Sequence, residues 1–175
     1  MPIQINIPVP EEIQKIAESE DLKLVWIFFV FFSRFEYALK RCPRYLEGSH
    51  QEARPRWNLF ASDHDHLFKP SSSSELTNSL EYFLRKPPRK QVCKGGRLGW
   101  SEPQHHDGKG TLLKWLLRMV RCVRNNLFHG GKFPLIPISD PSHDQELLQN
   151  SIVILNACLE FHPDVKNHFF ENIED

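Results

Sequence analysis

The chain has 175 residues and a mass of 20.6 kDa, and hydrophobic residues make up 40 % of it. This size and composition predict a single folded domain over residues 1–175 and exclude a largely disordered chain. Lysine and arginine together number 22, as do aspartate and glutamate, so net charge alone indicates no particular partner.

Cysteine usage and the first residues predict a cytoplasmic protein. Cys42, Cys93, Cys122 and Cys158 are widely separated and form no CxxC pair. This spacing argues against a disulfide scaffold and a zinc finger, and favours a reducing compartment. The opening MPIQINIPVP lacks the basic flank and the apolar core of a signal peptide.

A long first helix is predicted. It begins around Pro10, and neither glycine nor proline occurs from there to Arg41. We expect one helix, or two with a break near Asp21. Its apolar run Leu24–Phe32 is nine residues long, whereas a membrane span needs about 20, so no membrane association is expected. The run is typical of a helix buried on most sides.

A second helix is predicted within SSSSELTNSLEYFLRK. Ser72 and Glu75 have the spacing of a capping box. Apolar residues then recur at helical spacing, and Pro87-Pro88 ends the helix. A fourth helix begins near Asp140, which can cap it, and Pro141 suits its first turn.

Two long connections separate these helices. Residues 43–71 contain Trp57 and Phe60, so part of that segment is expected to pack on the core. Residues 87–110 contain five glycines, three prolines and five Lys or Arg against two acids. Loops longer than about 15 residues are uncommon in compact domains and are often functional. No alternating pattern of useful length appears, so we expect no strands. The predicted fold is all-α, a bundle of four to six helices with long loops.

The third helix, from about Thr111 to His129, has two different faces. Apolar residues share one side at 100° per residue and predict core packing. The other side carries Lys114, Arg118 and Arg121, and no acid occurs between Lys109 and Lys132. A solvated basic face is one explanation. Because like charges repel at this spacing, an anionic ligand such as an RNA phosphate is the other. Lys114, Arg118, Arg121 and Lys132 are the expected RNA-binding residues.

A polar cluster is expected where this helix ends. Arg124, Asn125 and His129 lie there, and Gly130 can close the helix. A histidine near a helix end is often only a favourable dipole interaction. However, histidine can act as acid or base near neutral pH, and arginine matches phosphate oxygens. RNA cleavage without a metal needs a base, an acid and a cation. Because one chain supplies one such histidine, a two-fold dimer would supply both acid and base.

The segment RNNLFHGGK resembles the R-x4–6-H motif of the HEPN superfamily, in which asparagine often follows the arginine. The long first helix with FFSRFEYALKR and the second helix ending in PPRKQ are similar to stand-alone prokaryotic HEPN proteins from toxin–antitoxin and anti-phage settings. The resemblance covers residues 10–170. It implies a cytoplasmic homodimer that joins two motifs into one metal-independent ribonuclease site with no cofactor, and an antitoxin or defence protein as a further partner.

Several residue roles follow from this resemblance. Arg124 and His129 would be catalytic, and Asn125 would support them. Glu36 on the first helix, beside Arg34, would join the site, although a surface carboxylate paired within its helix is an equal alternative. The tyrosine that accepts a modification in some HEPN toxins is replaced here by Gly131.

The sequence also allows other interpretations of the function and of two histidine-containing clusters. The protein could be a non-catalytic HEPN module that binds a nucleotide or a protein partner. Two histidine-containing clusters, Asp63–His66 and His105-His106, suggest a divalent-metal site and an RNA contact respectively. Flexible polar loops are the alternative, and we favour that explanation for Asp63–His66.

Overall fold

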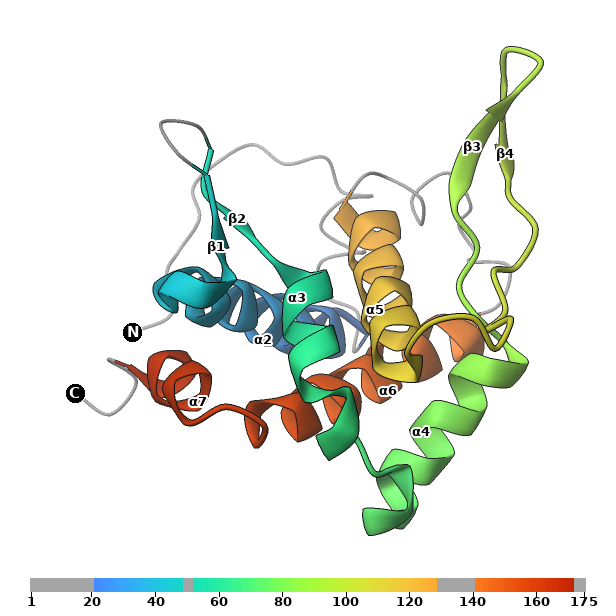
Figure 1. Cartoon of the computed structure of the whole chain (residues 1–175). Helices are drawn as coiled ribbons and strands as arrows, with labels where there is room; N and C mark the ends of the chain where they lie inside the picture. Colours follow the sequence, from blue (N-terminus) through green and yellow to red (C-terminus); the bar gives the residue numbers. More distant parts are fainter. Residues whose placement is uncertain (1–20, 49–51, 129–140, 172–175) are drawn as a thin grey trace, which may run out of the picture.

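Six α-helices and two short β-hairpins form the part of the chain that the computed structural model describes, residues 21–48, 52–128 and 141–171 (Figure 1). The helices are α2 Asp21–Arg41, α3 Trp57–His64, α4 Ser74–Arg85, α5 Leu112–Phe128, α6 Pro141–Leu159 and α7 Pro163–Phe170. The strands are β1 Leu46–Glu47, β2 Arg54–Pro55, β3 Gln91–Lys94 and β4 Arg97–Trp100. Single 3-10 turns cover Pro43–Tyr45, Asp65–Leu67 and Pro70–Ser72. The prediction of a mainly helical fold is confirmed.

The helix ends follow from local sequence, with one correction. Helix α2 ends at Arg41, as expected, whereas any break before Asp21 lies outside the described residues. Helix α4 is capped by Ser73, whose hydroxyl accepts from the main-chain N–H of Leu76 at 3.3 Å. The prediction that Ser72 caps this helix was therefore wrong, because Ser72 closes the preceding 3-10 turn. The proposed cap at Asp140 lies outside the described residues.

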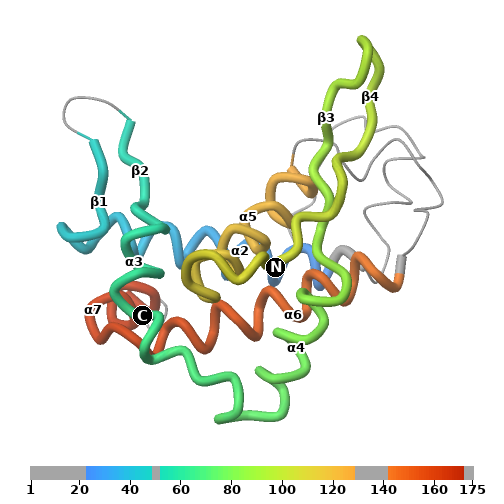
Figure 2. Tube along the Cα trace, turned by 45° about the vertical axis from the view of Figure 1, so that its right-hand side comes forward, coloured from blue at the N-terminus to red at the C-terminus, as the bar shows by residue number. Residues whose placement is uncertain are grey.

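The two β-hairpins were not expected. Strands β1 and β2 pair Leu46 with Pro55, and β3 and β4 pair Gln91 with Trp100. Each strand has only two or four residues, too few for alternation to show in the sequence. Gly95-Gly96 was the available signal, because two glycines with positive φ suit a two-residue hairpin turn. Both hairpins project to the same side of the helices, and α5 lies between them (Figures 1 and 2).

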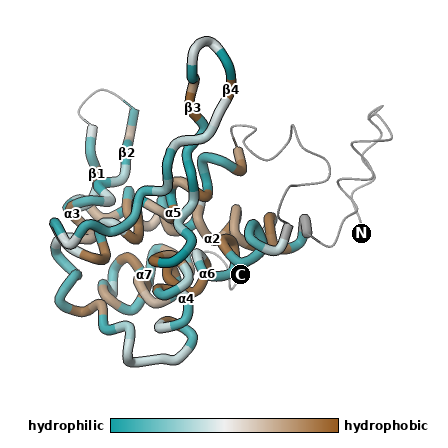
Figure 3. Tube along the Cα trace, turned by 90° about the vertical axis from the view of Figure 1, so that its right-hand side faces the viewer, coloured by the Kyte–Doolittle hydropathy of each residue, from teal (hydrophilic) through white to brown (hydrophobic). Residues whose placement is uncertain are grey.

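Aromatic side chains build much of the core. The Phe35 and Trp57 rings stack with centroids 5.3 Å apart and planes 11° apart, which fixes α3 against α2. Phe60 meets Phe35 edge-on at 5.6 Å, and Tyr45 meets Phe60 at 5.3 Å. Figure 3 shows hydrophobic segments concentrated along the helices, whereas the β3–β4 hairpin mixes hydrophilic, near-neutral and hydrophobic segments. Helix α2 packs on both α6 and α7, and α4 packs on α6.

One face of α2 remains exposed, which corrects the expectation of burial on most sides. Phe28 and Phe32 are buried, but Trp26 is 63 % exposed and Val30 is 40 % exposed. Trp26 packs on Phe29 with ring centroids 5.5 Å apart. The apolar run therefore makes a two-sided helix. No described helix is both long enough and apolar enough to cross a bilayer.

Candidate functional site

Helix α5 separates an apolar face from a cationic face, as the sequence predicted. Leu116, Met119, Val120 and Val123 are buried in the core. On the opposite side Lys114, Arg118 and Asn125 are exposed, and Arg121 is half-buried. The helix therefore presents a row of cations to the space between the two hairpins.

The start of α5 explains the DHDH cluster. The Asp65 carboxylate accepts a hydrogen bond of 3.1 Å from the main-chain N–H of Leu113, so it stabilises the helix N-terminus. Asp63 pairs with Arg44 and accepts from the Tyr45 hydroxyl. His64 is buried. These side chains hold structural elements together, which corrects the expectation of a flexible turn.

The metal alternative for this cluster finds no support within the described ranges. There, no three His, Cys, Asp or Glu side chains gather in a way that could hold a metal ion.

Arg124 is held in one orientation near the end of α5. Its Nη1 donates to the Asn125 Oδ1 at 3.0 Å. Its guanidinium carbon lies 5.6 Å from the centre of the Phe32 ring and 5.8 Å from that of Phe128. A planar cation is attracted to both ring faces, so these contacts restrict the arginine without neutralising it. The guanidinium is therefore restrained by contacts from three side chains.

Two of the predicted residues cannot be placed. His129 and Lys132 lie outside the described residues, as does the Gly130-Gly131 pair. His129 follows directly on Phe128, the last residue of α5.

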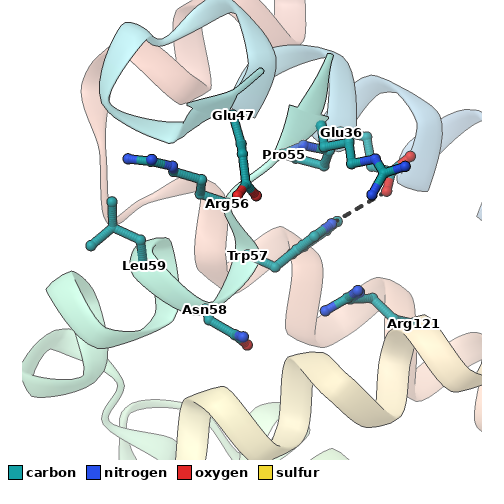
Figure 4. A pocket seen from close by; sticks show the side chains of 9 residues that line it. Glu36, Glu47, Pro55, Arg56, Trp57, Asn58, Leu59 and Arg121 are labelled. Atoms are coloured by element: carbon teal, nitrogen blue, oxygen red, sulfur yellow. Dashed lines mark hydrogen bonds between the residues drawn. The ribbon is translucent and has the colours of Figure 1, made fainter. Parts of the chain in front are cut away.

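Glu36 points into a cleft beside α5. Its carboxylate accepts from the Trp57 Nε1 at 3.2 Å, and Arg121 reaches toward the same cleft from α5 (Figure 4). The cleft encloses about 650 Å³ and also contains Asn58. Glu36 follows Phe32 by one helical turn, so it lies on the side of α2 that faces Arg124. The full lining is Glu36, Glu47, Arg54, Pro55, Arg56, Trp57, Asn58, Leu59 and Arg121.

Arg34 has a different role from Glu36. Its Nε donates to the carbonyl of Phe169 at 2.8 Å, and its Nη2 donates to the carbonyl of Glu171 at 2.6 Å. It therefore caps the C-terminal end of α7 rather than reaching the cleft.

Two further hollows lie next to the cleft along α5. A hollow of about 440 Å³ lies between the β3–β4 hairpin and α5 and shares Arg121 with the cleft. A third, of about 320 Å³, shares Arg118 with the second and is bordered by Lys109 and Lys114. We call these three hollows together the α5 groove. Its lining contains more Lys and Arg than Asp and Glu. Such a groove attracts polyanions.

Asn126 was not predicted as important, although it lies within the motif. It is buried, and its amide donates to the main-chain carbonyl of Arg89 at 2.7 Å. The Cys122 thiol approaches the same carbonyl at 3.7 Å. The only available signal in the sequence was a second asparagine after the arginine. At about 100° per residue this asparagine lies on the apolar side of the helix, which is expected to pack on the core. Asn126 ties the base of the β3–β4 hairpin to α5.

The histidine pair in the long basic connection packs on the helices. His105 contacts the carbonyl of Leu84 at 3.2 Å, and the His106 ring meets the Trp115 ring edge-on at 5.6 Å. His105 borders the third hollow, whereas His106 packs on α5.

Comparisons of the chain with protein-family models, with curated proteins and with solved structures gave no match.

Proposed function

We propose that the protein is a metal-independent endoribonuclease of the HEPN type that acts as a toxin or defence effector. The observation that carries the proposal is the restrained Arg124 guanidinium, held by Asn125 and two aromatic rings beside a cationic groove. The sequence adds a histidine five residues later, within the resemblance to the R-x4-H motif.

The chemistry assigns a role to each residue. A base removes the proton of the ribose 2′-OH, whose oxygen attacks the adjacent phosphorus. The bond from phosphorus to the 5′-oxygen breaks, and an acid protonates that leaving oxygen. The products are a 2′,3′-cyclic phosphate and a 5′-hydroxyl. His129 from each of two chains supplies base and acid, and Arg124 stabilises the charge on the phosphate oxygens.

Asn125 positions Arg124 through its carbonyl oxygen. Glu36 acts from the neighbouring cleft by orienting Arg121 or the substrate. Lys114, Arg118 and Arg121 bind the RNA backbone along the α5 groove, and Lys132 adds to them.

A homodimer is supported by an exposed aromatic patch next to Arg124. Phe128 is 45 % exposed and contacts Phe29 with ring centroids 5.1 Å apart. Phe29 in turn meets Trp26, and Val30 follows on the same exposed side of α2. We define these four residues, Trp26, Phe29, Val30 and Phe128, as the aromatic patch. Exposed apolar patches of this kind mark interaction surfaces. A two-fold contact here would bring both Arg124 side chains toward one site.

The deciding experiment is an RNase assay with purified wild type and two single variants. His129→Ala and Arg124→Ala should each abolish cleavage, and any growth arrest on expression. Truncating His129 should change the free energy of unfolding by no more than about 1 kcal/mol, the size expected for a histidine that follows a helix end in the sequence. Arg118→Ala is the matched control, since it should weaken RNA binding in a salt-dependent way without removing the chemistry.

A second candidate is a non-catalytic HEPN module that binds a nucleotide or a protein partner. The cleft at Glu36 favours it, because three arginines and a volume of about 650 Å³ suit a phosphorylated ligand. This candidate replaces the first if the wild type cuts neither single-stranded nor structured RNA and His129→Ala is as toxic as wild type. Nucleotides should then raise the melting temperature, and Arg121→Ala should remove that shift.

A further inference from the structure

Positive charge is concentrated in two segments of this otherwise balanced chain. Residues 85–101 contain six Lys or Arg and no Asp or Glu. Residues 109–128 contain five Lys or Arg and again no acid. The first segment includes the β3–β4 hairpin and the second includes α5. A chain with equal totals of acid and base thus has two acid-free regions.

The fold brings these two segments together. Asn126 of α5 holds the carbonyl of Arg89 at the base of the hairpin. Above that contact, Lys90 faces Arg121 and Asn125 across the hollow of about 440 Å³. Cations from two distant parts of the chain therefore border one space within the α5 groove.

The hairpin tip carries a pair of like charges. Lys94 and Arg97 are directly paired across the strands, on either side of Gly95-Gly96. Both are exposed, and neither forms an ion pair with any residue in the described ranges. Like charges opposite one another destabilise a hairpin. The aliphatic part of Lys94 lies over Gly99 of the facing strand, but the two charges do not stabilise the hairpin. An anion bound near both charged ends would relieve their repulsion.

We propose that the β3–β4 hairpin is an RNA-binding arm that holds the phosphate backbone beyond the nucleotides seated in the α5 groove. The inference rests on the proposed function for the identity of the polyanion. Four residues of strand separate Lys90 from the tip by about 13 Å. Stacked nucleotides rise about 3.4 Å each, so reaching the tip takes about four more nucleotides. The preferred substrate is an RNA strand longer than a few nucleotides.

The arm can be tested by binding, separately from cleavage. In a His129→Ala background, the affinity of Lys94→Gln/Arg97→Gln is compared for two RNAs, a trinucleotide and a single strand of about 20 nucleotides. The longer RNA should bind about tenfold more weakly to the double variant. The slope of the logarithm of the binding constant against the logarithm of the salt concentration should become shallower by about 1.4, because two phosphate contacts are lost. The trinucleotide should bind as before. Lys23→Gln/Lys69→Gln, which removes two exposed cations elsewhere, should change neither affinity.

Three results would overturn the arm. The first is an unchanged affinity of the double variant for the longer RNA. The second is an equal loss of affinity for the trinucleotide. The third is a loss of affinity for polyglutamate but not for RNA. The proposed function fails separately. If wild type never cuts RNA but the double variant loses the longer RNA, the arm stands and the nuclease does not. If wild type cuts RNA and the double variant binds it normally, only the arm is refuted.

Discussion

The amide of Asn126 donates a 2.7 Å hydrogen bond to the main-chain carbonyl of Arg89, joining the base of the β3–β4 hairpin to the last turns of α5. Asn126 lies two residues after Arg124, the arginine of the proposed catalytic motif. The hairpin and the proposed active site therefore share one rigid helical segment. A change at this contact should move the arm without touching Arg124 itself.

Asn126→Ala should lower the free energy of unfolding by about 1–2 kcal/mol, because the carbonyl of Arg89 loses its amide donor and keeps only the longer contact of 3.7 Å with the Cys122 thiol. Amide protons of β3 and β4 should exchange faster than in wild type, whereas those of α2 should not, since the hairpin is released from α5. Urea unfolding and hydrogen exchange measure the two effects. Asn125→Ala, at the adjacent exposed position, is the control and should change stability by less than about 0.5 kcal/mol. Equal effects of the two substitutions would contradict the anchoring role.

Val30→Glu or Trp26→Glu should convert a dimer into a folded monomer, because each places a charge in the aromatic patch. Sedimentation at micromolar concentration measures the change, and circular dichroism checks that the helices persist. Leu98→Glu is a matched control, since Leu98 is 69 % exposed on the hairpin, outside the patch. Wild type that sediments only as a monomer would count against the shared active site.

RNA cleavage should persist in EDTA, because the proposed chemistry relies on histidine and arginine rather than on carboxylates that could hold a metal. The measurement is the cleavage rate before and after chelation. Loss of cleavage that Mg²⁺ or Mn²⁺ restores would assign the chemistry to other residues of the chain.

Stability should fall as the pH drops below about 6.5, owing to His64. Burial against Tyr45 and Phe60 lowers the pKa of this histidine in the folded state. The unfolded chain therefore takes up the proton first, and the stabilisation that is complete above the unfolded pKa is lost on acidification. Urea unfolding across this window measures the slope. His64→Phe should flatten the slope, whereas His66→Gln, at an exposed position, should not.

Two carboxylates contribute to stability in a way that is lost only at lower pH. A hydrogen bond from Arg44 lowers the pKa of Asp63, and one from His168 lowers the pKa of Glu171. Their stabilisation is present above the ordinary carboxylate pKa of about 4 and is lost as the pH falls further. A loss of stability that begins only near pH 4 would therefore exclude His64 as the responsible group.

Local patterns in the sequence predicted helices α2, α4, α5 and α6 and the two faces of α5, but neither α3 nor α7. Leu116, Val120 and Val123 recur at helical spacing, and burial at this spacing requires no knowledge of the partner helix. Serine and proline also mark the two ends of α4 in the local sequence. Which serine is the cap, Ser72 or Ser73, depended on the 3-10 turn that precedes the helix. The motif residues Arg124 and Asn125 were likewise picked out from the local sequence, and the roles of Arg124, Asn125 and His129 stay predictions.

Only the tertiary structure decided which distant groups meet. The contact between Asn126 and Arg89 joins residues 37 apart, and that between Trp57 and Glu36 joins residues 21 apart. No periodicity encodes such pairs, because they depend on how whole helices pack. Arg34 and Glu36 illustrate the limit. They are two positions apart in the sequence, and side chains at this spacing point about 200° apart around a helix. Arg34 therefore caps α7, whereas Glu36 enters the cleft beside α5.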